Sequence, residues 1–235
     1  MELERFAQKR GYEIIQNLPS KKNQVALIRD GDELGILKVF AEPESGATQR
    51  EREGLVRTRE AGVAVPMVRG IWYSRILLLE YIEGTNLGDL TPRELIDVAP
   101  ALARWFARLH QIEGAPRNTS FLRGDSILRN FILMPRGGIA GVDLEEWEWG
   151  DPARDLGEVV ASALTIDPPF TREAILMARR LHREYTLMAP NPGNARMQRE
   201  TLEALHRMAD RRPEAADALR QGIERLTLDR EPFGR

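Results

Sequence analysis

The stretch Arg123-Gly124-Asp125-Ser126-Ile127-Leu128-Arg129-Asn130, together with Gly141-Val142-Asp143 further along the chain, is the most informative part of this sequence. Between the two lie short apolar runs on either side of Pro135-Arg136-Gly137-Gly138. Such a pattern is typical of a strand, a turn and a second strand. Because a hairpin returns the chain to its starting point, we expect Asp143 to come back beside Asn130.

These polar residues have the chemistry that phosphoryl transfer requires. A transferred γ-phosphoryl group carries spread negative charge, so its site needs Mg2+ held by oxygen ligands and an acceptor that orients the attacking hydroxyl group. Asp125 can be that acceptor, while Asn130 and Asp143 can be metal ligands. A single aspartate is more often a turn residue or a helix cap. The interpretation therefore depends on whether the upstream sequence supplies the rest of such a site.

An apolar strand upstream contains one lysine, Lys38, within Gly35-Ile36-Leu37-Lys38-Val39-Phe40. A buried lysine needs a partner because its charge is costly to desolvate, and nucleotide phosphates are one candidate. A helix is predicted from Ala47 to Glu60, and its Glu51 or Glu53 can pair with Lys38. We favour Glu51, because an apolar residue lies four positions on, on the same helical face. The alternative is that this charge-rich helix is only a solvated surface.

A second buried strand, Ile76-Leu77-Leu78-Leu79-Glu80, breaks into the loop Tyr81-Ile82-Glu83-Gly84. The backbone around Glu80 and Ile82 is expected to be exposed where the strand ends. Backbone N–H and C=O groups in such a loop can bond the edge of an adenine ring. We therefore predict that this loop binds the base of a nucleotide.

Taken in order, these features resemble the protein-kinase-like fold at Lys38, Glu51, Leu79-Glu80-Tyr81, Asp125, Asn130 and Asp143. The chain is similar more specifically to the aminoglycoside phosphotransferase branch, and also to the small Bud32 and RIO type atypical kinases. The similarity covers about residues 20 to 165. The branch-specific stretches are Glu60-Ala61-Gly62-Val63-Ala64-Val65-Pro66, Leu79 to Gly84, and Gly150-Asp151-Pro152-Ala153-Arg154-Asp155-Leu156.

The resemblance implies an α+β, bilobal architecture. Residues 1–79 would form a nucleotide-binding lobe with an antiparallel sheet and one helix, residues 80–84 a hinge, and residues 85–235 a mainly helical catalytic and substrate lobe. It also implies ATP and Mg2+ as cofactors, with Lys38 on the α and β phosphates. Asp155 would be a buried aspartate that holds the catalytic loop through its backbone amides.

The chain departs from the family pattern in two places. The loop expected to cover the phosphates, Pro19-Ser20-Lys21-Lys22-Asn23, contains no glycine, although glycine lets backbone amides approach phosphate closely. Side chains such as Ser20 and Lys21 can contact phosphate instead, or the loop is simply a polar hairpin. The second departure is Arg123, which stands where the family usually has histidine.

The segment after Asp143 is short, because only Leu144 to Gly150 precede the next helix-start signal at Asp151-Pro152. It leaves no room for the long activation segment of a regulated protein kinase. Its acidic residues alternate with Trp147 and Trp149 and can attract a cationic sugar. We favour the alternative of an exposed acidic loop with tryptophans anchored in the core.

The C-terminal part is predicted to be helical. Thr91-Pro92-Arg93-Glu94 is a capping box, and the helix that it begins is expected to end near Glu113-Gly114. Three further helices are predicted to begin near Thr171, Asn194 and Pro213. The first of these three should bury a stripe made by Ile175, Leu176, Leu181 and Tyr185. His110 is expected to be a packed histidine, and no histidine is given a catalytic role.

Composition agrees with a globular protein. The 235 residues are 42% hydrophobic and 30% charged, with a net charge of −2 and no cysteine. The missing basic excess argues against nucleic-acid binding, and without cysteine there is no disulfide or thiolate chemistry. Neither a secretory signal nor an apolar run of membrane-spanning length is visible, so we expect a cytoplasmic protein without membrane partners.

The sequence thus predicts an ATP-dependent phosphotransferase that moves the γ-phosphoryl group to a hydroxyl group of a small, aminoglycoside-like or sugar-like molecule. A Bud32-like or RIO-like Ser/Thr protein kinase, with a protein acceptor or a complex partner, is the alternative enzyme. A nucleotide-binding pseudokinase or scaffold is the alternative outside enzymes, motivated by the glycine-free loop and Arg123. Retention of Lys38, Asp125, Asn130 and Asp143 together argues against the scaffold.

Overall fold

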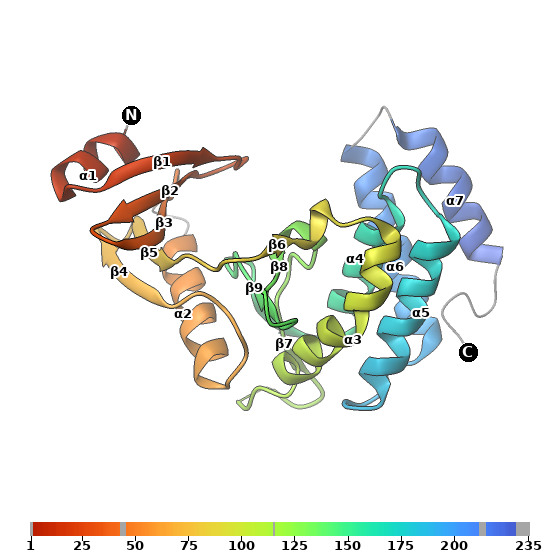
Figure 1. Ribbon diagram of the computed structural model, residues 1–235. Coiled ribbons are helices and arrows are strands. Elements are labelled where there is room, and N and C mark those ends of the chain that lie inside the picture. Colours follow the sequence, from red (N-terminus) through yellow and green to blue (C-terminus); the bar gives the residue numbers. More distant parts are fainter. Residues whose placement is uncertain (1, 43–45, 115, 212–214, 229–235) are drawn as a thin grey trace. The chain divides into compact units, whose positions relative to one another are not determined.

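The computed structural model describes residues 2–42, 46–114, 116–211 and 215–228 (Figure 1). The chain divides into two compact units. Unit 1 comprises Met1–Glu83 with Gly141–Trp147, and unit 2 comprises Gly84–Ala140 with Glu148–Arg235. Within the described ranges, no helix is both long enough and apolar enough to cross a membrane.

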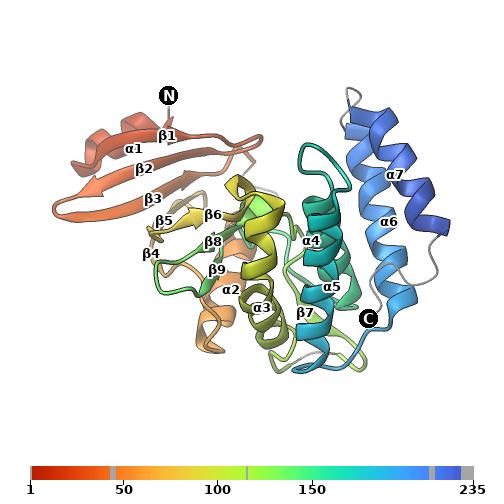
Figure 2. The ribbon, with the colours of Figure 1, turned by 45° about the vertical axis from the view of Figure 1, so that its right-hand side comes forward.

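Unit 1 is built on an antiparallel sheet of five strands in the order β1-β2-β3-β5-β4. Helix α1 packs against β1 and β3 of this sheet, and helix α2 packs against β4 and β5; Figure 2 shows α1 alongside β1. The elements are α1 (Glu2–Arg10), β1 (Glu13–Leu18), β2 (Gln24–Asp30), β3 (Glu33–Val39), α2 (Ala47–Glu60), β4 (Val68–Trp72) and β5 (Ile76–Glu80).

The unit 1 core forms because the alternating residues of the strands face α1. Ala26 and Ile28 of β2 and Leu37 of β3 are fully buried and belong to one cluster with Leu3 and Phe6 of α1. Successive side chains on a strand point to opposite faces. The apolar face of the sheet is therefore covered by the apolar stripe of α1.

Unit 2 combines short strands with long helices. Strand β6 pairs with β8 and β8 with β9, while β10 pairs with β7. Helix α3 packs against α5, α4 against α6, and α6 against α7. The elements are β6 (Thr85–Asn86), η2 (Leu87–Asp89), α3 (Pro92–Leu109), β7 (Ser120–Leu122), η3 (Leu128–Asn130), β8 (Phe131–Leu133), β9 (Ile139–Gly141), β10 (Glu148–Gly150), α4 (Ala153–Leu164), α5 (Arg172–Thr186), α6 (Asn194–Arg211) and α7 (Ala216–Leu228).

Helix α3 begins as predicted but ends earlier. The Thr91 hydroxyl accepts the Glu94 N–H, and the Glu94 side chain accepts the Thr91 N–H, which completes the capping box. The α-helix ends at Leu109 rather than near Gly114. The reason is a tightening of the last turn, in which Ile112 N–H bonds to Leu109 O, three residues back.

The buried face of α5 differs from the predicted stripe. Leu181 and Tyr185 are fully buried as expected, but Leu176 is 39% exposed and Ile175 is half-buried. Facing the core with Leu181 and Tyr185 are Ala174, Met177 and Ala178. These buried residues follow the spacing of three and four that is typical of one helix face. The predicted Ile175 and Leu176 are larger apolar residues that lie one position away from the buried Ala174 and Met177. Helix starts at Thr171 and Asn194 are confirmed, and Pro213 lies outside the described residues.

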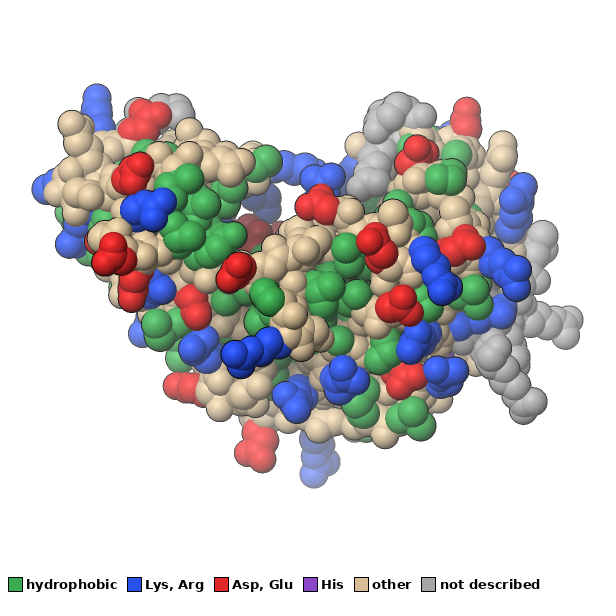
Figure 3. Space-filling model, viewed as in Figure 1, with side chains coloured by type: hydrophobic (Ala, Val, Ile, Leu, Met, Phe, Trp, Pro, Cys, Tyr) green, Lys and Arg blue, Asp and Glu red, His purple; other side chains and the backbone are tan. Residues whose placement is uncertain are grey.

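Charge of both signs is mixed over the face of the molecule that Figure 3 draws. On the face drawn in Figure 3, Lys and Arg side chains are interspersed with Asp and Glu in both units. This agrees with the near balance of 34 basic and 36 acidic residues.

Candidate active site

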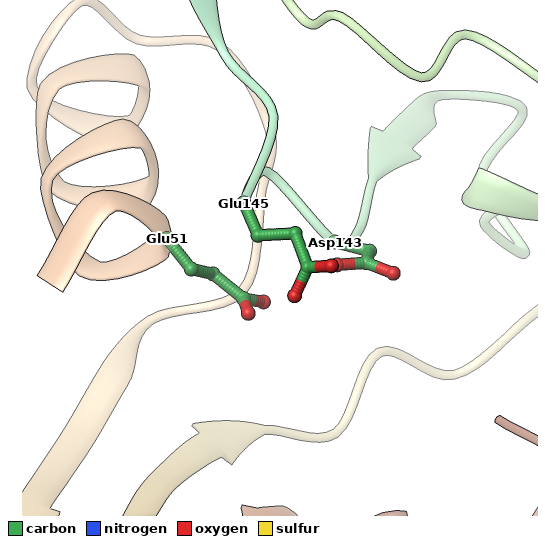
Figure 4. Close-up of side chains that lie close together, drawn as sticks. All are labelled: Glu51, Asp143 and Glu145. Atoms are coloured by element: carbon green, nitrogen blue, oxygen red, sulfur yellow. The ribbon is translucent and has the colours of Figure 1, made fainter. Parts of the chain in front are cut away.

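Unit 1 gathers three carboxylates around one buried amine. Lys38 is 5% exposed. Its Nζ atom lies 2.7 Å from Glu51 Oε2, 2.8 Å from Asp143 Oδ1 and 3.2 Å from Glu145 Oε2. Figure 4 shows the carboxylates of Glu51, Asp143 and Glu145 converging on one region. Residues from a strand, a helix and the segment after β9 thus meet at a single charged centre.

The structure pairs Lys38 with Glu51, the glutamate that helical spacing favours. Glu51 is 1% exposed and lies on the buried face of α2 with Leu55. Glu53 instead accepts a hydrogen bond of 2.9 Å from Gln49 on the exposed side. The alternating charges of α2 are therefore a solvated surface along part of the helix, whereas Glu51 belongs to the interior.

The three carboxylates stabilise the charge of Lys38, whereas they repel one another. Burial by itself would lower the pKa of Lys38, but Glu51, Asp143 and Glu145 raise it far above its ordinary value. Burial raises the pKa of Glu51, the nearby Lys38 ammonium works against that rise, and the Asp143 and Glu145 carboxylates add to it. We therefore treat Lys38 as permanently charged. An ammonium group fixed in this way is a binding group for anions such as phosphate.

Asp143 has an unusual backbone conformation. Its φ angle is 60°, in the left-handed region that residues with a Cβ atom seldom adopt. Residues held in this way cluster at functional sites, where the surrounding structure maintains them. The Asp143 side chain is 42% exposed. It therefore remains accessible although one oxygen bonds to Lys38.

The glycine-free loop between β1 and β2 is closed by its own side chains and by the segment after Asp143. Ser20 Oγ accepts the Asn23 N–H at 3.2 Å. Asn23 Nδ2 donates to Glu145 Oε2 at 3.1 Å, and Lys22 Nζ lies 3.5 Å from Glu146 Oε1. Lys21 is exposed. The loop is thus a polar hairpin in this structure, and whether Ser20 or Lys21 contacts phosphate stays a prediction.

The proposed base-binding segment lies at the end of β5. Glu80 N–H donates to Met67 O at 2.8 Å, and the Glu80 carboxylate accepts from Met67 N–H and from Arg59. The Glu80 carbonyl is therefore the backbone group through which this residue can bind adenine. Ile82 is half-buried in a segment without regular secondary structure. Both assignments remain predictions.

Unit 2 contains the second part of the candidate site. Asn130 ends the short helix η3, and its Nδ2 atom donates to both the backbone oxygen and Oδ2 of Asp125, each at 2.9 Å. With both amide hydrogens used in this way, Oδ1 of Asn130 is the atom suited to a cation. Asp125 and Asn130 are thus brought together, whereas Lys38, Glu51 and Asp143 meet in unit 1.

Asp155 of α4 holds the loop that carries Asp125. Its two carboxylate oxygens accept the N–H of Arg123 at 2.8 Å, the N–H of Gly124 at 3.2 Å and the hydroxyl of Ser126 at 2.8 Å. This is the supporting role that the sequence predicted. Burial would raise the pKa of Asp155, but His110, 3.2 Å away, and these hydrogen bonds lower it.

His110 and Arg123 are both interior residues. The other ring nitrogen of His110 lies 2.9 Å from the Tyr185 hydroxyl, which confirms a packed histidine. Arg123 is fully buried, and its guanidinium lies 5.2 Å from the centre of the Phe131 ring. A planar guanidinium stacks well on an aromatic face. Arg123 is thus an interior residue that packs on Phe131.

The acidic segment after Asp143 is only partly the exposed loop that we favoured. Trp147 donates its indole N–H to Arg50 O at 2.8 Å, and Trp149 packs edge-on against Phe121. Both tryptophans are half-buried and anchored, as expected. Glu145, however, is 14% exposed at its side chain and bonds to Lys38 and Asn23. The sequence placed Glu145 in the acidic cluster but gave no signal for this contact.

Two further residues were missed, Glu158 and Ser162 of α4. Glu158 Oε2 accepts the Ser126 N–H at 2.8 Å, and Ser162 Oγ accepts the Leu128 N–H at 3.1 Å. Both lie on the same face of α4 as Asp155, at spacings of three and seven residues. Polar residues at helical spacing after Asp155 were the available signal, although nothing local shows that they face a loop.

Comparison with known proteins places this fold. No protein-family model matches the sequence, and no curated protein matches it either. Among solved structures, the aminoglycoside phosphotransferase APH(2'')-Ib in its ADP-bound form has a TM-score of 0.65 at 14% identity, covering 99% of this chain and 98% of that one. The macrolide 2'-phosphotransferase MphH from Brachybacterium faecium has a TM-score of 0.65 at 16% identity, covering 96% and 97%.

A third structure is the aminoglycoside phosphotransferase APH(3'')-Id from Streptomyces rimosus in complex with ADP and streptomycin. It has a TM-score of 0.64 at 15% identity, covering 86% of this chain and 97% of that one. At these identities the similarity shows the fold. The chain has the α+β, kinase-like fold of the aminoglycoside phosphotransferases, as its sequence predicted.

Proposed function

We propose that this protein is an ATP-dependent phosphotransferase that acts on a hydroxyl group of a small molecule. The observation that carries the proposal is the buried Lys38 held by Glu51 and Asp143, in a fold shared with phosphotransferases. A permanently charged amine beside an accessible carboxylate suits a metal-bound polyphosphate. The pairing of Asp125 with Asn130 in unit 2 supports the same chemistry.

The donor atoms suit Mg2+. Asp143 offers a carboxylate oxygen and Asn130 an amide oxygen, and oxygen ligands are those that Mg2+ prefers. When bound, the ion would neutralise the negative charge of the phosphates. Lys38 would bind the α and β phosphates, Ser20 and Lys21 the phosphate edge of the nucleotide, and Glu80 and Ile82 the adenine. Glu51 would keep Lys38 in place.

Asp125 would handle the proton. The acceptor hydroxyl oxygen attacks the γ-phosphorus, the bond from phosphorus to the β–γ bridging oxygen breaks, and ADP leaves with that oxygen. Asp125 orients the hydroxyl group and takes its proton. Asn130 donates to the Asp125 Oδ2 atom and so fixes the direction of that carboxylate.

A small-molecule acceptor is favoured by the segment after Asp143. The chain passes from Asp143 to the start of α4 at Ala153 through one short strand, β10. This segment is too short to contain a loop that positions a peptide substrate. The similar structures named above are phosphotransferases described for aminoglycosides and a macrolide, which supports testing hydroxylated small molecules first.

The first test is binding and transfer in wild type and Asp125→Asn. We expect ATP to raise the Tm only when Mg2+ is present. We also expect wild type to transfer phosphate to at least one amino sugar or sugar in a panel that also contains generic protein acceptors. Asp125→Asn should keep the Tm shift and lose transfer by about 100-fold or more, because proton transfer contributes roughly 10²–10⁴-fold. Asp97→Asn, at a side chain 72% exposed on α3, is the control.

The outcomes separate the alternatives. Transfer to protein acceptors alone would favour the protein kinase, and Mg2+-dependent ATP binding without any transfer would favour the scaffold. If ATP together with Mg2+ does not change the Tm of wild type, the proposal of an ATP-dependent enzyme is wrong.

A further inference from the structure

Helix α4 presents a row of acceptors to the loop that carries Asp125. Asp155 accepts the N–H groups of Arg123 and Gly124. One turn on, Glu158 accepts the Ser126 N–H, and one turn further Ser162 accepts the Leu128 N–H. Residues spaced by three and four share a helix face. The row therefore bonds successive parts of the loop on both sides of Asp125.

Glu158 is the member of this row that bonds next to Asp125. The Ser126 amide that it accepts belongs to the peptide unit following Asp125, and the N···O distance is 2.8 Å. Fixing that peptide plane restricts the backbone of Asp125 on its C-terminal side. Asp155 restricts the N-terminal side through Gly124. We propose that Glu158 is a positioning residue, which fixes the Asp125 carboxylate for the phosphoryl transfer proposed above.

The electrostatic surroundings of Glu158 distinguish it from a simple structural acceptor. Burial raises the pKa of Glu158 to about 7, with further upward contributions from Asp125 and Asp155. The hydrogen bond from Ser126 and the guanidinium of Arg207 on α6 act in the opposite direction. Glu158 therefore changes charge near neutral pH, where its bond to the loop changes from that of a carboxylate to that of a neutral acid.

This titration has a definite sign for stability. An ordinary glutamate in the unfolded chain loses its proton near pH 4.5, whereas folded Glu158 keeps it until about pH 7. Between these values the folded state binds more protons, so its stability falls as pH rises. Glu158→Gln cannot ionise and keeps an acceptor oxygen. It should be more stable than wild type at pH 8, and the difference in Tm should shrink toward pH 5.

The positioning role is tested by amide hydrogen exchange and by kinetics. In Glu158→Ala, exchange of the Ser126 amide should become about 5- to 150-fold faster, the fold-change that corresponds to losing a buried hydrogen bond. The kcat for transfer should fall by roughly 10- to 100-fold, with the KM for ATP unchanged because Lys38 and Glu51 lie in unit 1. Glu158→Gln should retain most of the protection and most of the kcat.

Glu200→Gln is the matched control. Glu200 is a glutamate of neighbouring α6 with a side chain 12% exposed, and its partner is Arg199. Glu200→Gln should leave the exchange rate of the Ser126 amide at its wild-type value. The Tm difference between Glu200→Gln and wild type should not vary with pH. If Glu158→Ala does not fold, Glu158→Gln still tests the proposal through Ser126 exchange: its excess over the wild-type rate should be larger at pH 8, where wild type offers a carboxylate, than at pH 5.

The results distinguish failure of this inference from failure of the proposed function. Wild-type exchange at Ser126 and wild-type kcat in Glu158→Ala would overturn the role of Glu158. A Tm difference between wild type and Glu158→Gln that does not vary with pH would show that Glu158 does not ionise near pH 7, and would contradict the pH dependence given above. Absence of transfer in wild type, with Ser126 exchange still dependent on Glu158, would instead overturn the proposed function.

Discussion

At the scale of single residues, the interior of unit 2 depends on a charged group that is completely enclosed. Asp155 is 1% exposed and accepts hydrogen bonds from Arg123, Gly124 and Ser126, beside His110. A buried carboxylate is costly unless such donors surround it. The same donors become costly when the carboxylate is removed, because each is then buried without a partner.

We therefore predict that Asp155→Ala destabilises the protein by about 3–5 kcal/mol, the cost of removing one partner of a buried charged pair. The measurement is urea denaturation at pH 7. Since the pKa of Asp155 is lowered in the folded state, its stabilisation is present above about pH 4 and is lost as pH falls through the folded value. Asp155→Asn should remove this part of the acid sensitivity.

Asp97→Ala is the matched control for Asp155. Its side chain is 72% exposed and lies 3.5 Å from Arg180, so we expect a change within about 0.5 kcal/mol. A comparable loss of stability in both variants would mean that the network around Asp155 has no special importance.

The same scale shows what the sequence can predict about the site. Glu51 was found because helical periodicity is local, and Leu55 marks the buried face. The Asp155 contacts were found by resemblance. Glu145 was not found, because its contact with Lys38 depends on the backbone turn at Asp143, where φ is 60°. No pattern of residue types in the segment encodes that turn.

At the scale of elements, helix starts were predictable and helix ends and faces were less so. Thr91 and Thr171 cap their helices through their own side chains, so the signal is confined to one turn. The end of α3 depends on how its last turn tightens, and the buried face of α5 depends on its packing against α3. Tertiary contacts overrode the choice of Leu176, which a sequence pattern alone had favoured.

The packing of α4 on α6 gives a prediction at this scale. A Cβ atom at Gly157 would lie 2.7 Å from Glu200 Cβ and 2.8 Å from the Thr201 backbone nitrogen, so the two helices approach closely there. In Gly157→Ala the helix gains about 1 kcal/mol in propensity, whereas overpacking costs roughly 1–3 kcal/mol. Because backbone atoms cannot move aside as a side chain can, we expect net destabilisation.

Thermal denaturation of Gly157→Ala measures this balance. Glu203→Ala, at a side chain of α6 that is 54% exposed, is the control and should change stability by no more than about 0.5 kcal/mol. A rise in Tm for Gly157→Ala would show that propensity outweighs packing and that α4 and α6 tolerate a wider separation. Because α4 carries Asp155 and Glu158, a wider separation should also loosen the catalytic loop.

At the scale of the whole molecule, unit 1 is assembled from two stretches of chain. Residues 141–147 belong with the N-terminal sheet although unit 2 supplies the residues on either side of them. Leu144 is fully buried, and Trp147 donates its indole N–H to Arg50 O on α2. Asp143 and Glu145 supply two of the three carboxylates around Lys38. The N-terminal sequence by itself therefore lacks part of its own core.

This organisation predicts that a fragment of residues 1–83 does not fold stably. Without the returning segment, the surface that covers Leu144 is exposed, and Lys38 keeps only Glu51 as a partner from this cluster. Both changes disfavour folding, and a small unit with a limited core has little folding free energy to offset them. A fusion in which a Gly/Ser linker joins residue 83 to residues 139–150 should restore folding, because it returns Leu144 and the two carboxylates. Circular dichroism and thermal melting compare the two proteins. A cooperative melt of the short fragment, at the same temperature as the fusion, would show that the sheet and α2 are sufficient and that the returning segment serves the site alone.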